Sequence, residues 1–316
     1  MLPRLPRILF VLGKGGVGRS TVSAALAMAL RRRGARTLVF EWTLSEAIAP
    51  WYGLAPAGID PIEVEPGLAV ANFCLEDSLR AYFVGHLGLG AFYRHVVNGR
   101  AMRRLVEAAP GIAEMMFLGH LSWLTTLAEK EVGLAFDRIV VDAPATGHGV
   151  SLLELPATLA SMHASGLLGK EVGRVLEMMG DRLWTGALVV TTPEELATEE
   201  TLELVPRATR SLGRPLVAAL VNRGAGSILS DDAAPPWLDA CGAALSPPAR
   251  AGLAIVRAEL RSRLGFERDL RTKLAGATER GVIALDEQLG LVPEVSSRAV
   301  AAALATALAP FCAEDE

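Results

Sequence analysis

Short apolar runs alternate with helix-like stretches along the chain. Residues 7–12 form an apolar run of the kind found in buried strands, and residues 37–40 form another. Residues 20–33, between them, have helical spacing, and Gly34 is placed to end that helix. Alternation of this kind is typical of a parallel sheet covered by helices.

Three later segments repeat one pattern, an apolar run that ends in polar or turn residues. They are "FDRIVVDAP", "GALVVTTPEE" and "PLVAALVNR". We expect an α/β fold with a doubly wound, mostly parallel sheet, whose ligands gather at the carboxyl ends of the strands. Residues 223–236 are small, polar and proline-rich, and they predict a loop.

Composition narrows the class of protein. The 316 residues are 51% hydrophobic and 21% charged, enough to bury a sizeable core. Apolar stretches fall short of the roughly 18 to 20 residues of a membrane helix, and the first is too short for a secretory leader. Cys74, Cys241 and Cys312 are far apart, which favours neither a disulfide framework nor a zinc site. These features predict a cytoplasmic protein without zinc.

The net charge of −4 gives no reason to expect nucleic acid as a partner. One basic cluster, Arg31, Arg32, Arg33 and Arg36, falls where the first helix should end. Positive charge is favourable there because of the helix dipole, so we interpret the cluster as structural.

The segment "VLGKGGVGRST", residues 11–21, has nearly the spacing of a phosphate-binding loop, with Arg19 where lysine is usual. Its glycines let backbone N–H groups turn toward phosphate oxygens, and the helix that follows adds its positive end. A glycine turn between strand and helix is the structural alternative. We expect the loop to bind a nucleotide through Gly13, Lys14, Gly15, Gly16, Val17, Gly18, Arg19, Ser20 and Thr21.

Lys14 gives the loop the form K-G-G-x-G-[KR]-[ST], which resembles the deviant Walker loop. In proteins with that loop the early lysine reaches a nucleotide held by the facing subunit. The segment "IVVDAPATGHGVSLLELP", residues 139–156, resembles the switch II signature of the arsenite-pump (ArsA) and guided-entry ATPases. The resemblance implies ATP and Mg²⁺ as cofactors, with Ser20 and Asp142 as the magnesium ligands. It also implies a homodimer, or a heterodimer with a paralogous ATPase.

The resemblance extends over most of the chain. "VVTTPEELATEET" (189–201), "VIALDEQLG" (282–290) and "LVNR" (220–223) are similar to family segments, and in the last of these Asn222 would read adenine through its carboxamide. "APGIAEMM" (109–116) resembles the entry to the family's helical subdomain. The resemblance thus implies one domain over residues 1–316, with a helical subdomain at about 75–132 and 157–185.

Two departures bear on catalysis. Arg19 keeps the positive charge of the usual lysine but is bulkier, planar and forked. "FEWTLSEAI", residues 40–48, lacks the family's switch I aspartate, which positions the attacking water. Glu41 is the nearest carboxylate, and it is either a substitute base or a structural residue. We expect Lys14, Arg19 and Glu41 to be the catalytic residues of a slow ATPase.

Three functions are compatible with these residues. The first is an ATP-driven switch that handles a partner or cargo, and the second is a non-hydrolysing regulatory subunit paired with an active paralogue. The third is a chaperone for hydrophobic segments, with a hydrophobic protein cargo or a membrane partner. Methionines suit adaptable apolar surfaces, but we favour core packing for these six: Met102, Met115, Met116, Met162, Met178 and Met179.

Overall fold

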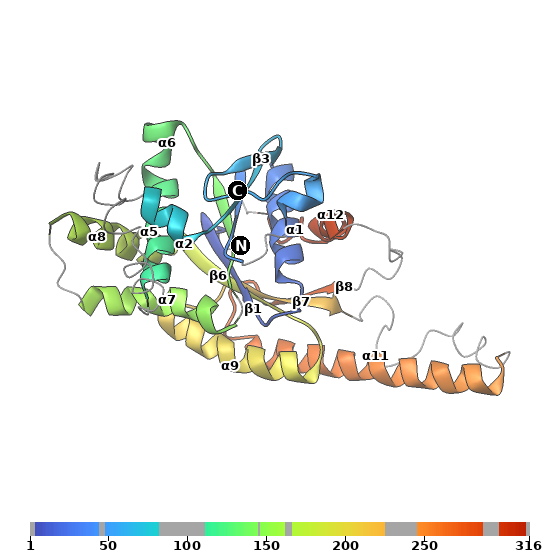
Figure 1. Cartoon of the computed structure of the whole chain (residues 1–316). Coiled ribbons are helices and arrows are strands. Elements are labelled where there is room, and N and C mark those ends of the chain that lie inside the picture. Colours follow the sequence, from blue (N-terminus) through green and yellow to red (C-terminus); the bar gives the residue numbers. More distant parts are fainter. Residues whose placement is uncertain are drawn as a thin grey trace.

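The computed structural model describes residues 4–43, 48–81, 111–144, 146–161, 166–224, 245–286 and 297–313, and the statements below concern these residues. An eight-stranded sheet in the order β3-β4-β2-β5-β1-β6-β7-β8 forms the centre (Figure 1). All neighbouring strands are parallel except β3 and β4. The predicted α/β class with a mostly parallel sheet is therefore confirmed. The strands are β1 (Ile8–Gly13), β2 (Thr37–Glu41), β3 (Ile62–Glu65), β4 (Leu68–Asn72), β5 (Arg138–Asp142), β6 (Thr185–Thr191), β7 (Ala218–Gly224) and β8 (Val282–Asp286).

Helices cover both faces of the sheet because successive strand residues point to opposite sides. Leu9 and Val11 of β1 belong to the core beneath α1 (Arg19–Arg32) and α12 (Ser297–Ala307). Phe10 and Leu12 belong to the core on the other face. That face is covered by α5 (Ile112–Thr126), α7 (Thr146–Ser161), α8 (Gly166–Gly180), α9 (Glu195–Leu212) and α11 (Pro247–Leu274). The remaining helices are the short η1 (Ala49–Tyr52), α2 (Leu75–Arg80) and α6 (Ala128–Val132).

The register of the sheet brings the carboxyl ends of its central strands together on one side. Asp142 at the end of β5 lies opposite Val11 of β1 on one side and Glu41 of β2 on the other. Gly13 lies opposite Val190 of β6. The pattern of apolar runs predicted that these carboxyl ends lie together, but it did not predict the antiparallel hairpin of β3 and β4. The residues of β3 are only partly buried, so they lack the continuous apolar run of the inner strands.

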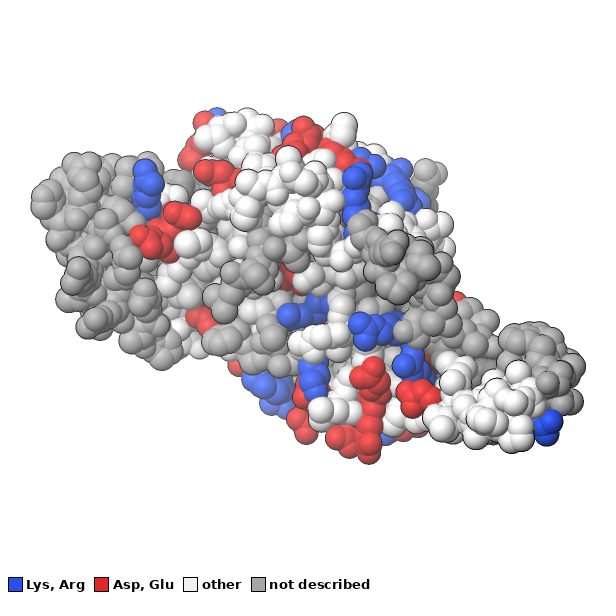
Figure 2. All heavy atoms as spheres, turned by 45° about the vertical axis from the view of Figure 1, so that its right-hand side comes forward, with Lys and Arg blue, Asp and Glu red and all other residues white. Residues whose placement is uncertain are grey.

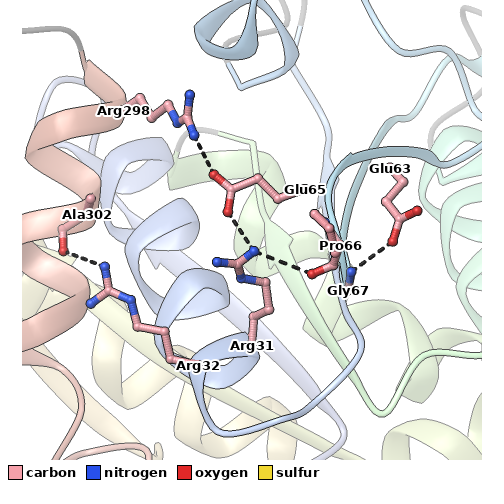
Figure 3. A network of polar contacts seen from close by, with 8 residues as sticks. All are labelled: Arg31, Arg32, Glu63, Glu65, Pro66, Gly67, Arg298 and Ala302. Carbon is pink, nitrogen blue, oxygen red and sulfur yellow. Dashed lines mark hydrogen bonds and ion pairs between the residues drawn. The ribbon is translucent and has the colours of Figure 1, made fainter.

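Part of the predicted basic cluster ties the outer elements together (Figure 3). Arg31 at the end of α1 and Arg298 of α12 both contact the carboxylate of Glu65, each at 2.6 Å. Arg32 donates a hydrogen bond to the carbonyl oxygen of Ala302 at 3.2 Å. These arginines therefore join α1, the edge hairpin and α12, which agrees with a structural role.

The helices near the predicted subdomain share a core with the sheet. Phe117 of α5 stacks on Phe40 of β2, with 4.8 Å between ring centroids. Within 75–132 the described elements are α2, α5 and α6, while 157–185 contains the end of α7 and all of α8. Division of the chain into a domain and subdomain stays a prediction.

The described methionines of the predicted cluster pack in this core. Met178 and Met179 are only 3% and 4% exposed. Met115 and Met116 pack against the same cluster, whereas Met102 and Met162 lie outside the described residues. The preference for core packing is confirmed for these four. Among the described helices, none is long and apolar enough to cross a membrane.

Candidate phosphate and magnesium site

The loop between β1 and α1 has two glycines, Gly13 and Gly18, at which a side chain would clash with neighbouring strands. Gly13 has φ +150°, and a Cβ there would clash with the backbone oxygen of Val190. Gly18, just before α1, has φ +87°, and a Cβ there would clash with the side-chain nitrogen of Asn222. The lack of a side chain therefore lets β6 and the end of β7 approach the loop closely.

Two serines of α1 contact the carboxylate that ends β5. Ser20 donates a hydrogen bond to Asp142 Oδ2 at 2.6 Å, and Ser23 donates one to Oδ1 at 3.4 Å. The predicted magnesium ligands, Ser20 and Asp142, are thus brought together. Sequence reasoning missed Ser23, although a serine three residues after Ser20 lies on the same side of a helix.

The environment of Asp142 suits an ion with oxygen ligands. Asp142 is fully buried, and burial raises the pKa of its carboxyl group. Hydrogen bonds from Ser20 and Ser23 and the charge of Arg19 act in the opposite direction. A carboxylate with an adjacent hydroxyl supplies the hard oxygen donors that Mg²⁺ prefers. The residues present therefore fit a magnesium site.

Arg19 connects the loop to the end of β5. Its Nη1 donates a hydrogen bond to the carbonyl oxygen of Ala143 at 2.7 Å. Burial lowers the pKa of the guanidinium group, and the carboxylate of Asp142 raises it. Ala143 follows Asp142 within the segment that resembles switch II, so Arg19 bridges the two predicted nucleotide-binding elements. Its role toward phosphate stays a prediction.

Lys14 is paired within its own chain. Its Nζ lies 3.0 Å from Glu200 Oε1 of α9, and both side chains are about one-third exposed, at 28% and 34%. Glu200 lies in the segment 189–201, but sequence reasoning gave it no role. The glutamate-rich start of α9 was the available signal.

Asn222 at the end of β7 contacts the loop. It is 8% exposed, and its Nδ2 donates a hydrogen bond to the carbonyl oxygen of Val17 at 2.9 Å. The next residue, Arg223, has φ +57°, and the register with β8 shifts between Asn222 and Gly224. The irregular strand end therefore places Asn222 under the loop, and reading of adenine stays a prediction.

Glu41 ends β2 beside Asp142. It is fully buried, and the register of the sheet sets it opposite Asp142. Val39, two residues earlier, belongs to the core beneath α1, so Glu41 lies on the α1 side of the sheet. Residues 44–47 and 225–244 lie outside the described residues. The same holds for the side chain of His148, the histidine of the segment that resembles switch II.

A glycine loop after β1, a serine at the start of α1 and an aspartate at the end of β5 form one site. Residues 6–165, which contain all three, match the family model described as anion-transporting ATPase. The chain belongs to the anion-transporting ATPase family. The resemblance to the ArsA ATPases is thereby confirmed.

Relatives of the same family agree with this assignment. The chain is 28% identical over 226 residues to the ATPase BagA of Mycobacterium tuberculosis, covering 69% of this chain and 65% of BagA. It is 28% identical over 172 residues to an arsenical pump-driving ATPase of Escherichia coli, covering 51% of this chain and 27% of that protein. Such a protein from Acidiphilium multivorum is 27% identical over 164 residues, with the same coverage of 51% and 27%. The chain thus spans less than two thirds of these relatives.

Proposed function

We propose that this anion-transporting ATPase family member is a cytoplasmic, dimeric switch that binds Mg·ATP and hydrolyses it slowly. The contact of 2.6 Å between Ser20 and Asp142 carries the proposal. It sets a hydroxyl and a buried carboxylate directly beside a glycine loop. Such an arrangement suits a nucleoside triphosphate with its divalent cation better than it suits an uncharged ligand.

Each residue of the site has a role in this proposal. Backbone N–H groups of the loop and the start of α1 would hold phosphate oxygens, and Arg19 would add positive charge. Ser20 and Asp142 would hold Mg²⁺, which when bound neutralises charge on the β- and γ-phosphates. Asn222 donates a hydrogen bond to the loop at Val17, and its carboxamide is suited to adenine.

We infer slow hydrolysis from the residues at the carboxyl ends of the central strands. Arg19 is engaged with the carbonyl oxygen of Ala143, and Glu41 is the carboxylate that ends β2. Phosphoryl transfer depends on positioning and charge stabilisation, and loss of one preorganised interaction commonly costs on the order of 10² to 10³ in rate. We therefore place turnover low, with Glu41 as the substitute for the missing switch I aspartate.

The dimer gives Lys14 its proposed function. In the partner-bound state its ammonium would leave Glu200 and reach the nucleotide of the facing subunit. The switch would couple this rearrangement to a protein partner or cargo.

One observation favours a second function, that of a regulatory subunit which binds nucleotide without hydrolysing it. Arg19 donates to a backbone oxygen within the segment resembling switch II, and a compact lysine would sit differently there. In that case an active paralogue would supply the intact catalytic residues.

Nucleotide content and turnover test the proposal. The purified protein should contain adenine nucleotide or bind it, and millimolar Mg·ATP should raise its melting temperature. Phosphate release should be slow but measurable for the chain alone. Turnover that appears only with the paralogue would favour the regulatory subunit. No thermal shift, while an intact family member responds in parallel, would contradict both functions.

A further inference from the structure

Ser23 is a fully buried serine within an apolar stretch of α1. Val22 before it and the residues from Ala24 to Leu30 after it are buried as well. A hydroxyl group in such a place costs free energy unless it is hydrogen-bonded, and serines within helices often bond to a carbonyl oxygen of their own helix. Among the described residues, the hydroxyl of Ser23 bonds to Asp142 Oδ1 alone, at 3.4 Å. It therefore joins α1 to the end of β5.

Ser20 and Ser23 divide the carboxylate of Asp142 between them. Ser20 donates to Oδ2 at 2.6 Å, and Ser23 donates to Oδ1 over a longer distance. Residues three positions apart lie on the same side of a helix, so both hydroxyls reach β5 from α1. The terminal torsion of an aspartate side chain is broad, and a contact to one oxygen leaves it room to turn. Contacts to both oxygens restrict the plane of the carboxylate.

The burial of Asp142 makes this orientation matter. Figure 2 shows Lys, Arg, Asp and Glu side chains spread over the visible face of the molecule, where water and salt screen their charges. Asp142 is fully buried and lacks such screening. Charges interact more strongly in the protein interior than in water, so the direction of a buried carboxylate affects its affinity for a cation more than that of an exposed one.

We propose that Ser23 is a positioning residue for the divalent cation, because it holds Asp142 in the orientation that binds the ion. The inference rests on the proposed function, which assigns Ser20 and Asp142 to Mg²⁺. Ser23 is then the hydroxyl that orients the carboxylate without being a ligand itself. Removal of a group that hydrogen-bonds to a metal ligand typically lowers metal affinity by roughly 10- to 100-fold.

The substitution Ser23→Ala removes this hydroxyl and little else. Alanine is the best helix former and leaves only the volume of one oxygen atom empty, so the variant should fold. Thr37→Val is the matched control. Thr37 is also fully buried, and its hydroxyl donates to the carbonyl oxygen of Ala35 at 3.1 Å. It begins β2, at the end of that strand opposite Glu41. Each variant thus loses one hydrogen-bonded hydroxyl, but only Ser23 contacts the proposed magnesium site.

The experiment compares binding of a non-hydrolysable ATP analogue in Mg²⁺ and in EDTA by calorimetric titration of the full chain. The ratio of the two affinities measures what the ion contributes to binding. We expect this ratio to be about tenfold smaller in Ser23→Ala than in wild type, with equal affinities in EDTA. Thr37→Val should keep the wild-type ratio. The melting temperature of each nucleotide-free variant shows how much stability the lost hydroxyl contributed.

The other outcomes separate this proposal from the proposed function. If Mg²⁺ raises the affinity of wild type and Ser23→Ala equally, the Ser23 proposal is overturned and the proposed function stands. A loss of affinity by the same factor in Mg²⁺ and in EDTA also overturns it, since Ser23 would then support the loop as a whole. A wild type whose affinity is indifferent to Mg²⁺ contradicts the magnesium site of the proposed function and the Ser23 proposal together.

Discussion

Lys14 of the phosphate loop and Glu200 of α9 form an ion pair of 3.0 Å within one chain. The pair holds the ammonium group against its own subunit, whereas the proposed function requires it in the facing one. Formation of the dimer would therefore have to break this contact. Because both side chains are about one-third exposed, the pair is weak enough to exchange.

We expect Glu200→Gln to strengthen nucleotide-dependent dimerisation by several-fold, because it removes the competing carboxylate. Glu203→Gln, exposed on the same helix, is the control. Lys14→Ala should weaken the dimer more than it weakens nucleotide binding by the monomer. Sedimentation with a non-hydrolysable ATP analogue measures the monomer–dimer equilibrium of the wild type and of these three variants. An unchanged monomer–dimer equilibrium in Lys14→Ala would rule out a role for Lys14 across the dimer.

The substitution Arg19→Lys tests whether arginine limits the reaction. The guanidinium group now donates to the carbonyl oxygen of Ala143, and a lysine would free that oxygen and place a compact charge nearer the phosphates. We expect the rate of phosphate release to rise. Turnover that stays at background in Arg19→Lys would instead favour the regulatory subunit. The thermal shift with Mg·ATP shows whether the variant still binds nucleotide.

The substitution Glu41→Gln tests the substitute base. Glu41 and Asp142 are paired residues of neighbouring strands on the α1 side of the sheet, so Glu41 lies beside the proposed magnesium ligand. The neutral amide cannot accept a proton from water, and we expect most remaining turnover to be lost while the thermal shift with Mg·ATP persists. If turnover is indifferent to this change, another group positions the water.

Much of the fold could be predicted because its signals are local. Apolar runs predicted the inner strands, and the spacing of glycines predicted the loop before α1. The edge hairpin was missed because the half-buried residues of β3 lack such a run. The contacts of Arg19, Lys14 and Asn222 could not be predicted, since each depends on a residue more than 100 positions away. Which partner a long side chain meets is set by tertiary packing, which no local pattern encodes.

Asn222 should stabilise the protein even without nucleotide. Its Nδ2 donates to the carbonyl oxygen of Val17 in a site that is 8% exposed, and loss of such a hydrogen bond typically costs about 1 kcal/mol. We expect Asn222→Ala to lower the melting temperature of the nucleotide-free protein. Titration with ATP and GTP then tests the adenine role, because a base contact would make the loss larger for ATP. An unchanged melting temperature would mean that the loop contact contributes nothing.

Three glycines of the loop form a graded test of its geometry. Gly15 has no protein atom near the position of a side chain and no positive φ, so Gly15→Ala leaves the loop itself unstrained and can weaken binding only through contact with the phosphates. Gly16 has φ +88° with open space, so alanine there adds backbone strain alone. Gly18 combines φ +87° with a clash against Asn222, so Gly18→Ala must displace either the start of α1 or the side chain beneath it.

The expected order of Mg·ATP affinity follows from these differences. Gly15→Ala should lose least, Gly16→Ala should be weaker than wild type by about tenfold, and Gly18→Ala should be weakest because strain and clash act together. Circular dichroism would check that each variant is folded, and calorimetric titration would measure the affinities. The combination Gly18→Ala with Asn222→Ala removes the clash but keeps the strained backbone. Because Asn222→Ala alone has already lost any adenine contact, it is the reference: adding Gly18→Ala to it should cost about as much affinity as Gly16→Ala costs in the wild type, and a larger cost would show that the carboxamide is not what excludes a side chain at Gly18.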